Sequence, residues 1–191
     1  MTKIFFIRHL PTEWNKLKKI QGLKNNPIST NKKRYIKIKK FIQKEHKKSL
    51  HENKKTTVYT SALKRTIETA IFFEFENFKI SKKLNELNVG TAEGMPKDLF
   101  YKQLNISKKK IEIKGHKKIE NKKNFEKRII SFLKETKRFD EVICFCHGIW
   151  LKYLHCLLKN LNFNKIKNIN IKNADVFIYS SKNKNLKKLI I

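Results

Sequence analysis

The sequence predicts an α/β domain of three layers, in which a mostly parallel central sheet lies between two layers of helices. Short apolar runs of strand length alternate along the chain with longer segments whose apolar residues recur at helical spacing. Two of the runs, residues 3–7 and 142–146, are almost continuously apolar, which is typical of strands covered on both faces. The chain has 191 residues, of which 39% are hydrophobic, so we expect residues 1–191 to form a single domain around one core.

The first half should supply two strands and two helices. The expected elements are, in order, a strand at 3–7, a loop at 21–29, a helix from Ser29 or Thr30 to about Lys47, a polar spacer at 48–55, a strand at 56–61 and a helix from Ala62. Glycine, asparagine and proline predict the loop, and a serine or threonine hydroxyl can cap the helix that follows it. The expected apolar faces of the two helices are Tyr35, Ile38, Phe41 and Ile42 for the first, and Leu63, Ile67, Ala70 and Ile71 for the second.

The second half continues the alternation. The expected elements are a loop at 85–95, a short helix from Pro96 to Gln103, a short strand at 111–113, an exposed and mobile link to residue 120, a helix at 122–138, a strand at 142–146, a helix at 149–158 and a terminal strand or hairpin from 174–180 and 186–191. Phe125, Ile129 and Phe132 lie at helical spacing and predict the long helix. We expect residues around 96–120 to be a variable insert.

The net charge of +30 would ordinarily suggest a nucleic acid or an anionic membrane as the partner. The lysines, however, are spread through nearly every segment, and aromatic residues do not alternate with them as in proteins that bind single strands. An AT-rich coding sequence would give the same abundance of Lys, Asn, Ile and Phe. We therefore do not expect nucleic acid to be the main partner, although the positive field would raise encounter rates with a small phosphorylated substrate.

The compartment and the redox state also follow from the composition. No uncharged apolar stretch approaches the roughly 20 residues of a membrane span, and the first ten residues lack a secretory apolar region. We therefore expect a cytoplasmic protein without a membrane partner. Cys144, Cys146 and Cys156 are an odd number of cysteines without metal-type spacing, so we expect them to be reduced and buried.

Basic side chains follow three of the predicted strands. Arg8 and His9 end the first strand, His147 ends the strand at 142–146, and Arg65 lies near the start of the helix after the strand at 56–61. If these strands are parallel neighbours, the four side chains meet at one edge of the sheet, where α/β proteins place their sites. Only five of the 46 basic residues are arginines, and two of them, Arg8 and Arg65, lie at these strand ends. The planar guanidinium of arginine matches the oxygens of a phosphate group. The sequence therefore predicts a phosphate pocket.

The same residues carry a family resemblance. RHLPTEWN, at residues 8–15, resembles the RHGxTxxN signature of the histidine phosphatase superfamily, the phosphoglycerate mutase-like group. Four further segments are similar to motifs of that family in the same order: residues 21–29 to QGxxDxPLS, 61–70 to SxLxRAxxTA, 84–94 to LxExxxGxxEG, and CHG at 146–148 to the second histidine motif. The resemblance implies a phosphoglycerate mutase-like αβα sandwich. It also implies a metal-independent phosphoric monoester hydrolase of the histidine acid phosphatase type, with no cofactor.

The resemblance further implies a role for each matching residue. His9 would be the nucleophile that forms a phosphohistidine, and Glu86 would be the general acid and then the general base. The groups that would hold the phosphoryl oxygens are Arg8, Arg65 and His147, with further hydrogen bonds from Asn15 and Thr12. No metal would be required, because this cluster replaces a divalent cation. Glu93 would stabilise the loop or the arginines.

The sequence departs from the family pattern at Leu10, where glycine is usual, and at Asn25, where aspartate is usual. Leucine does not readily adopt a positive φ, so the turn at this point can differ from the family's. The outer wall of the pocket would come from residues 23–33 and 96–120, where lysine is dense, which suits a substrate with additional negative charge. The substrate itself and the oligomeric state cannot be predicted from the sequence.

Two other functions remain open at this point. A cofactor-dependent phosphoglycerate mutase would share the core, but the mutases of the family carry extra segments that enclose the substrate. Too few residues separate Gly94 from the strand at 142–146 to hold such segments, so hydrolysis is favoured. A non-catalytic module that binds phosphate or phosphoproteins would keep the arginines and lose the nucleophile or the acid, whereas this chain retains both.

Overall fold

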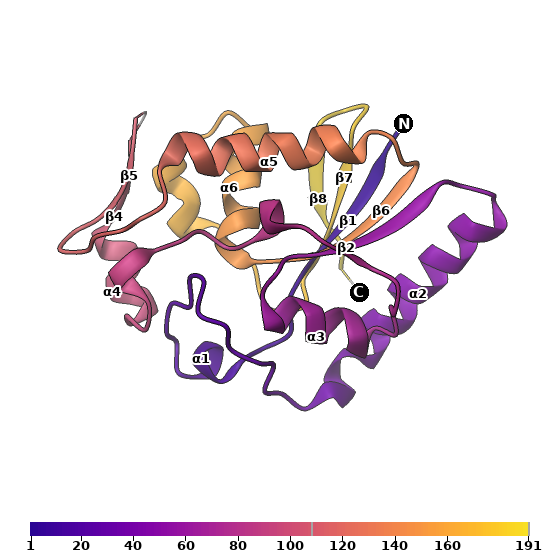
Figure 1. Cartoon of the computed structure of the whole chain (residues 1–191), viewed down its shortest axis with the longest axis horizontal. Coiled ribbons are helices and arrows are strands. Elements are labelled where there is room, and N and C mark those ends of the chain that lie inside the picture. The colour runs from indigo at the N-terminus through magenta and orange to yellow at the C-terminus, as the bar shows by residue number, and fades with distance from the viewer. Residues whose placement is uncertain (108, 191) are drawn as a thin grey trace.

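A six-stranded sheet divides the molecule into three layers (Figure 1). The computed structural model describes residues 1–107 and 109–190; Lys108, in the expected insert, and Ile191, in the expected last strand, lie outside the described residues. The strands are β1 (Lys3–Arg8), β2 (Thr56–Thr60), β3 (Lys79–Ile80), β6 (Glu141–Cys146), β7 (Val176–Ser180) and β8 (Asn185–Lys188). Their order is β3-β2-β6-β1-β7-β8, and only β7 runs against its neighbours, so the predicted fold class is confirmed.

The helices cover both faces of the sheet because the central strands are apolar on both sides. Helices α2 (Ile36–His51) and α3 (Lys64–Phe72) pack on one face, and α5 (Lys122–Thr136) and α6 (Gly148–Leu158) pack on the other. Figure 1 shows the two pairs on opposite sides of the strands. All three cysteines are free and buried, as predicted, with Cys144 and Cys146 on the face covered by α5 and α6.

The first long helix begins later than predicted. Asn31, and not Ser29 or Thr30, caps a turn of 3-10 helix at Lys32–Tyr35, because its side chain accepts the N–H of Lys33. The α-helix then continues to His51 and takes in half of the expected polar spacer. Its predicted apolar face is confirmed: Ile42 is buried, and Tyr35, Ile38 and Phe41 pack against the same cluster.

The predicted apolar face of α3 is wrong in part. Ile71 is 59% exposed, whereas Arg65, Thr66 and Thr69 are buried together with Ala70. The reason is that α3 turns a polar side toward the edge of the sheet, where the Thr69 hydroxyl accepts the N–H of Leu10 at 3.0 Å. Hydrogen bonds to the polar atoms make this burial possible.

The insert contains one strand that was predicted and one that was not. After the short helix α4 (Lys97–Gln103), β4 (Leu104–Ile106) pairs antiparallel with β5 (Ile111–Ile113) in a separate hairpin. The link that follows is anchored and not free, because Glu120 N donates to Asn88 O at 2.9 Å. A Cβ on Gly90 would lie 1.9 Å from the carbonyl oxygen of Lys117, so this contact requires glycine.

The remaining elements are short. They are α1 (Glu13–Lys16) and the 3-10 turns η2 (Lys82–Leu84), η3 (Gly90–Ala92) and η4 (Phe163–Asn168). The terminal segments form the predicted hairpin of β7 and β8, and the loop before β7 returns to the end of β1, where Ala174 N donates to Arg8 O. None of the helices in the described part of the chain is long and apolar enough to cross a membrane.

Candidate active site

His9 lies at the carboxyl end of β1 with its ring almost fully buried. Its Nδ1 is 2.6 Å from the carbonyl oxygen of Leu10. Because a carbonyl only accepts hydrogen bonds, Nδ1 carries the proton, and Nε2 is left with a free electron pair. This is the tautomer that an imidazole nucleophile needs.

Leu10 replaces the expected glycine without distorting this turn. Its φ is not in the positive range, so the glycine's conformational freedom is not used here. The side chain is fully buried in the cluster beneath α3, and the main chain bonds to Thr69 and His9 on either side. The departure from the family pattern therefore adds apolar packing under the site.

His147 ends β6, the strand next to β1, and its ring centroid lies 5.4 Å from that of His9. The ring is fully buried, and both of its nitrogens have partners. Arg65 Nε donates to Nδ1 at 3.2 Å, so Nε2 carries the proton and donates to Ser61 Oγ at 2.7 Å. His147 does not line the cavity described below, and a direct contact with a bound phosphoryl group would require the Arg65–His147 bond to open.

Burial keeps both histidines neutral. Desolvation lowers the pKa of His9 and the pKa of His147 well below the ordinary value, and the nearby charge of Arg65 lowers both pKa values further. The neutral ring of His9 keeps the free electron pair on Nε2, which a protonated imidazole lacks.

We expect the free energy of unfolding to fall as the pH falls from 7 to 5. The unfolded chain takes up protons on these two histidines near pH 6.5, whereas the folded chain does so only at lower pH, so acid favours unfolding. Each histidine contributes at most about 1.4 kcal/mol per pH unit. Urea titrations at several pH values measure the free energy of unfolding, and plotting it against pH gives the slope.

The control for this prediction is a histidine on the surface. His9 and His147 together contribute part of the slope of unfolding free energy against pH, and His147→Asn should roughly halve that part. His51→Asn, at the exposed end of α2, should leave the slope unchanged. A stability that stays flat from pH 7 to pH 5 would contradict the neutral, buried state of the two rings.

The two arginines approach the site from different elements. Arg65, in the first turn of α3, is 1% exposed and donates to the carbonyls of Lys24 at 2.8 Å and Gly22 at 2.9 Å. Burial lowers its pKa to about 10, so it remains charged at neutral pH. Arg8, at the end of β1, donates to the carbonyl of Ile171 at 2.7 Å, and its buried Nε has no partner among the described residues.

Glu93 holds the loop that positions Arg65. Its Oε1 accepts the N–H groups of Leu23 at 2.7 Å and Lys24 at 3.0 Å. Asn25, which stands where aspartate is usual, accepts the N–H of Lys64 in the first turn of α3 through its amide oxygen. An amide can therefore serve here in place of a carboxylate.

Of the two further predicted phosphate-binding residues, Asn15 lines the cavity and Thr12 does not. Thr12 is fully buried as the N-cap of α1, where its hydroxyl and its N–H bond to Asn15, and it does not line the cavity. Asn15 lines the cavity, and its Oδ1 accepts from Asn173, which also donates to the carbonyl of His9 at 2.9 Å. The amide nitrogen of Asn15 is the group that can donate to a ligand.

Glu86 lies against the N-terminus of α6. Its Oε1 accepts the N–H groups of Trp150 at 2.9 Å and Leu87 at 3.0 Å, and its Oε2 accepts that of Ile149 at 3.0 Å. The positive end of the helix dipole favours a carboxylate at this point. The side chain is 7% exposed and lines the same cavity as His9.

Arg128, which the sequence analysis missed, fixes the segment that carries Glu86. Its guanidinium donates to the carbonyls of Lys83 at 2.9 Å and Glu86 at 3.0 Å. It also forms a two-pronged ion pair with Glu120, at 2.7 Å through Nε and 3.0 Å through Nη2. The helix α5 thereby holds the position of the Glu86 backbone.

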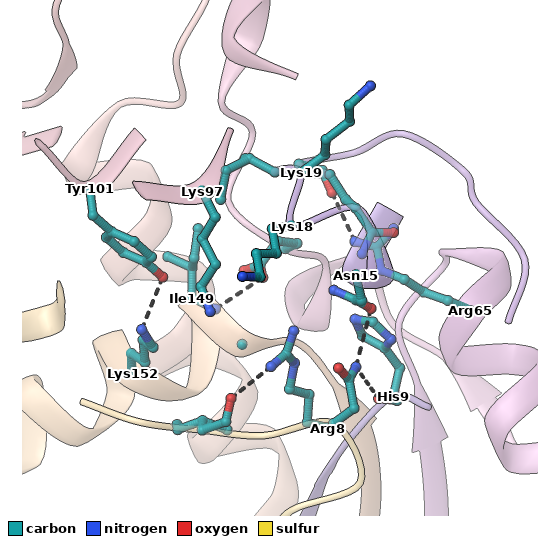
Figure 2. A pocket seen from close by; sticks show the side chains of 17 residues that line it. Arg8, His9, Asn15, Lys18, Lys19, Arg65, Lys97, Tyr101, Ile149 and Lys152 are labelled. Atoms are coloured by element: carbon teal, nitrogen blue, oxygen red, sulfur yellow. Dashed lines mark hydrogen bonds between the residues drawn. The ribbon is translucent and has the colours of Figure 1, made fainter. Parts of the chain in front are cut away.

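A cavity of about 130 Å³ lies between these elements, and it is lined by Arg8, His9, Asn15, Arg65 and Glu86 (Figure 2). Its cationic lining consists of Arg8, Arg65, Lys18, Lys19, Lys97 and Lys152. Glu86 is the one carboxylate among the described lining residues. The arrangement suits a small anion with more than one negative charge.

The wall of the cavity differs from the expectation. Residues 18–22 supply it in place of 23–33, while Lys97 and Tyr101 come from the expected 96–120 region. Lys152 was missed, although a lysine inside the apolar helix predicted at 149–158 was a usable signal. Outside Lys108 and Ile191, no three His, Cys, Asp or Glu side chains gather as metal ligands do.

Comparisons with known proteins agree on the family. The family model described as histidine phosphatase superfamily (branch 1) matches residues 4–189. Phosphoserine phosphatase 1 of Hydrogenobacter thermophilus is 25% identical over 190 residues, which cover 91% of this chain and 84% of that protein. The 2,3-bisphosphoglycerate-dependent phosphoglycerate mutase of Buchnera aphidicola subsp. Cinara cedri is 27% identical over 223 residues, covering 96% of this chain and 95% of that one.

Solved structures share the fold. A mutant phosphoserine phosphatase from Entamoeba histolytica in complex with phosphoserine has a TM-score of 0.71 at 20% identity, covering 98% of this chain and 95% of that one. The phosphoglycerate mutase from Thermus thermophilus has a TM-score of 0.70 at 16% identity, covering 99% of both chains.

Proposed function

The chain belongs to the histidine phosphatase superfamily, branch 1, and from this membership we propose that it is a phosphatase that hydrolyses a small phosphorylated metabolite through a phosphohistidine on His9. One observation carries the proposal. The nitrogen of His9 that has the free electron pair belongs to a ring that lines a cavity with two arginines and one carboxylate.

In the first step, Nε2 of His9 attacks phosphorus in line with the ester oxygen. A P–N bond forms, the P–O ester bond breaks, and the departing alkoxide takes a proton from Glu86, which enters this step as the carboxylic acid after taking up a proton from solvent. In the second step, Glu86 accepts a proton from water, and the resulting hydroxide attacks the phosphohistidine. Inorganic phosphate leaves, and His9 and Glu86 return to their starting states.

The arginines stabilise the charge that moves during both steps. Each guanidinium has five N–H donors, of which Arg8 uses one and Arg65 three in the bonds described above. The remaining donors can hold the equatorial oxygens, with the amide of Asn15 beside them. We propose that His147 joins them when the incoming phosphoryl group draws Arg65 Nε away from its Nδ1 and, arriving as the monoanion, gives Nδ1 a proton that it then donates to an equatorial oxygen.

The size of the cavity supports a small substrate. About 130 Å³ is well below the roughly 300–1,000 Å³ of pockets that hold drug-sized ligands. A phosphoryl group with a few further atoms fits this volume better than a nucleotide or a phosphoprotein segment does. The proposal therefore favours a small metabolite.

The rival function is a mutase, because some relatives carry that name. Incubation with 3-phosphoglycerate, a trace of its bisphosphate and a chelator separates the two. We expect inorganic phosphate release to outrun isomerisation. Isomerisation that outruns phosphate release would reject the phosphatase, and tight phosphate binding without any turnover would indicate a binding module.

A further inference from the structure

Two buried hydroxyls, those of Ser61 and Thr66 (the hydroxyl pair), lie between His147 and the main chain. Ser61 Oγ is 2.7 Å from His147 Nε2 on one side and 2.7 Å from Thr66 Oγ1 on the other. Thr66 Oγ1 is in turn 2.7 Å from the carbonyl oxygen of Leu63. The three side chains are fully buried. Thr66 is a further departure from the family pattern, which has alanine at this position of the motif that residues 61–70 match.

The three contacts fix the positions of three protons. Each contact joins two polar atoms at 2.7 Å, so each needs a proton between its atoms. The Leu63 carbonyl only accepts, so the Thr66 hydroxyl donates to it. Thr66 Oγ1 then accepts the proton of Ser61, and Ser61 Oγ accepts the proton on His147 Nε2. No other arrangement places a proton in each contact, so the hydroxyl pair requires the Nε2–H form of His147.

Arg65 favours the same form of His147 from the other side of the ring, because its Nε donates to Nδ1 at 3.2 Å. The two constraints differ in their response to a ligand. Arg65 lines the cavity, and in the proposed mechanism its bond to Nδ1 opens when the phosphoryl group arrives, whereas Ser61 and Thr66 do not line the cavity. The hydroxyl pair therefore still holds the proton on Nε2, and Nδ1 needs a second proton before it can donate to a ligand.

The charges around His147 keep this second proton off until an anion is present. Desolvation lowers the pKa of His147 well below the ordinary value, and the positive charges of Arg65, Arg128 and Arg8 lower the pKa further. A phosphoryl group that arrives as the monoanion brings both a proton and a negative charge to the ring. Transfer of that proton to Nδ1 leaves a phosphoryl dianion beside an imidazolium, which is a charge-assisted contact.

We propose that Ser61 and Thr66 are positioning residues that hold a proton on Nε2 of His147, so that the ring contacts the phosphoryl group as an imidazolium and not as a neutral donor. The second proton moves from a phosphoryl oxygen to Nδ1, and the ring then donates to that oxygen through Nδ1 and to Ser61 through Nε2. Without the hydroxyl pair, the ring would carry its one proton on Nδ1 and bind the phosphoryl group without a positive charge. This inference rests on the proposed phosphatase function.

Nitrogen-15 NMR of the histidine rings tests this role, because the nitrogen shifts distinguish the two neutral forms of the ring from the imidazolium. Sulfate is the probe, since at neutral pH it is a dianion without a proton and it is not hydrolysed. In the wild type we expect His147 to have the Nε2–H form without sulfate. At saturating sulfate it should be an imidazolium, with the second proton taken from solvent. The spectrum of His147→Asn identifies its signals.

Substitutions in the hydroxyl pair should change the ring in the sulfate complex. Thr66→Val should give the neutral Nδ1–H form, because the Ser61 hydroxyl loses its acceptor on Thr66 and donates to Nε2 instead. Thr66→Ser should restore the imidazolium. Ser61→Ala removes the acceptor of Nε2–H and should also give the neutral form, so the test does not depend on the folding of one variant.

The matched control is Thr136→Val. Thr136 is as buried as Thr66, and its hydroxyl donates to the carbonyl three residues earlier at 2.9 Å, as that of Thr66 does. We expect this variant to keep the imidazolium and the wild-type kcat/KM for p-nitrophenyl phosphate. Thr66→Val should lower that kcat/KM by about tenfold, the difference between a charge-assisted and a neutral hydrogen bond, and Thr66→Ser should retain most of it.

The outcomes separate this inference from the proposed function. A wild-type His147 ring that stays neutral while sulfate shifts the signals of His9 would overturn the positioning role, and so would an imidazolium in Thr66→Val. If the ring states are as expected but no phosphomonoester is hydrolysed, the proposed function fails and the positioning role stands. If sulfate shifts the signals of neither histidine, both fail, because both require an anion in this cavity.

Discussion

Replacing His9 by alanine should lower kcat/KM for p-nitrophenyl phosphate by about 1,000-fold or more in the presence of a chelator. The substitution removes the free nitrogen that would form the bond to phosphorus, and no other unprotonated ring nitrogen lines the described part of the cavity. His147 cannot take its place, because Arg65 and Ser61 occupy both of its nitrogens. Initial rates of nitrophenol release measure the effect.

The matched control is His51→Ala, which changes an exposed histidine at the end of α2 and should leave the rate unchanged. Circular dichroism should show that both variants fold. The wild-type enzyme quenched in base during turnover should carry a phosphoryl group that His9→Ala lacks. A rate for His9→Ala near that of the wild type would reject His9 as the nucleophile.

Replacing Glu86 by glutamine should slow alkyl phosphates by about 100–10,000-fold and p-nitrophenyl phosphate by about tenfold or less. An alkoxide needs a proton as it departs, whereas nitrophenolate leaves without one. Glutamine keeps the shape of the side chain, and its oxygen can still accept an N–H at the start of α6. The ratio of kcat/KM values for the two kinds of ester measures the role of the acid.

Two other variants separate chemistry from folding. Glu76→Gln, at an exposed position after α3, should change neither rate. Arg128→Met should show the pattern of Glu86→Gln in weaker form, because Arg128 positions the Glu86 backbone without lining the cavity. Equal losses of Glu86→Gln on both esters would argue against proton transfer by Glu86.

The convergence of Arg8, His9 and Arg65 could be predicted from the sequence for a physical reason. Parallel strands end at the same edge of a sheet, so residues that follow apolar runs must meet there once the strands are neighbours. The structure brings the end of β1 beside the end of β6, with Arg8 opposite Cys146. Glu86 has no such strand to follow, and only the family resemblance pointed to it.

Other features could not be predicted because they depend on tertiary contacts. Ile71 fits an apolar helical face, but α3 turns its threonines inward because Thr69 has a partner at Leu10. The strand β4 exists only because β5 pairs with it. Tyr101 and Lys152 are 51 residues apart, and their contact requires α4 and α6 to lie together. Periodicity along one segment carries no information about such partners.

The loop before β7 has a consequence for synthesis of the protein. Arg8 and His9 leave the ribosome before the Ile171 carbonyl and the Asn173 amide that bond to them, which follow 163 and 164 residues later. A nascent chain emerges from its N-terminus, so these bonds form only after the intervening residues have been made. The end of β1 therefore waits for the loop before β7 to be synthesised before the contacts of Arg8 and His9 are complete.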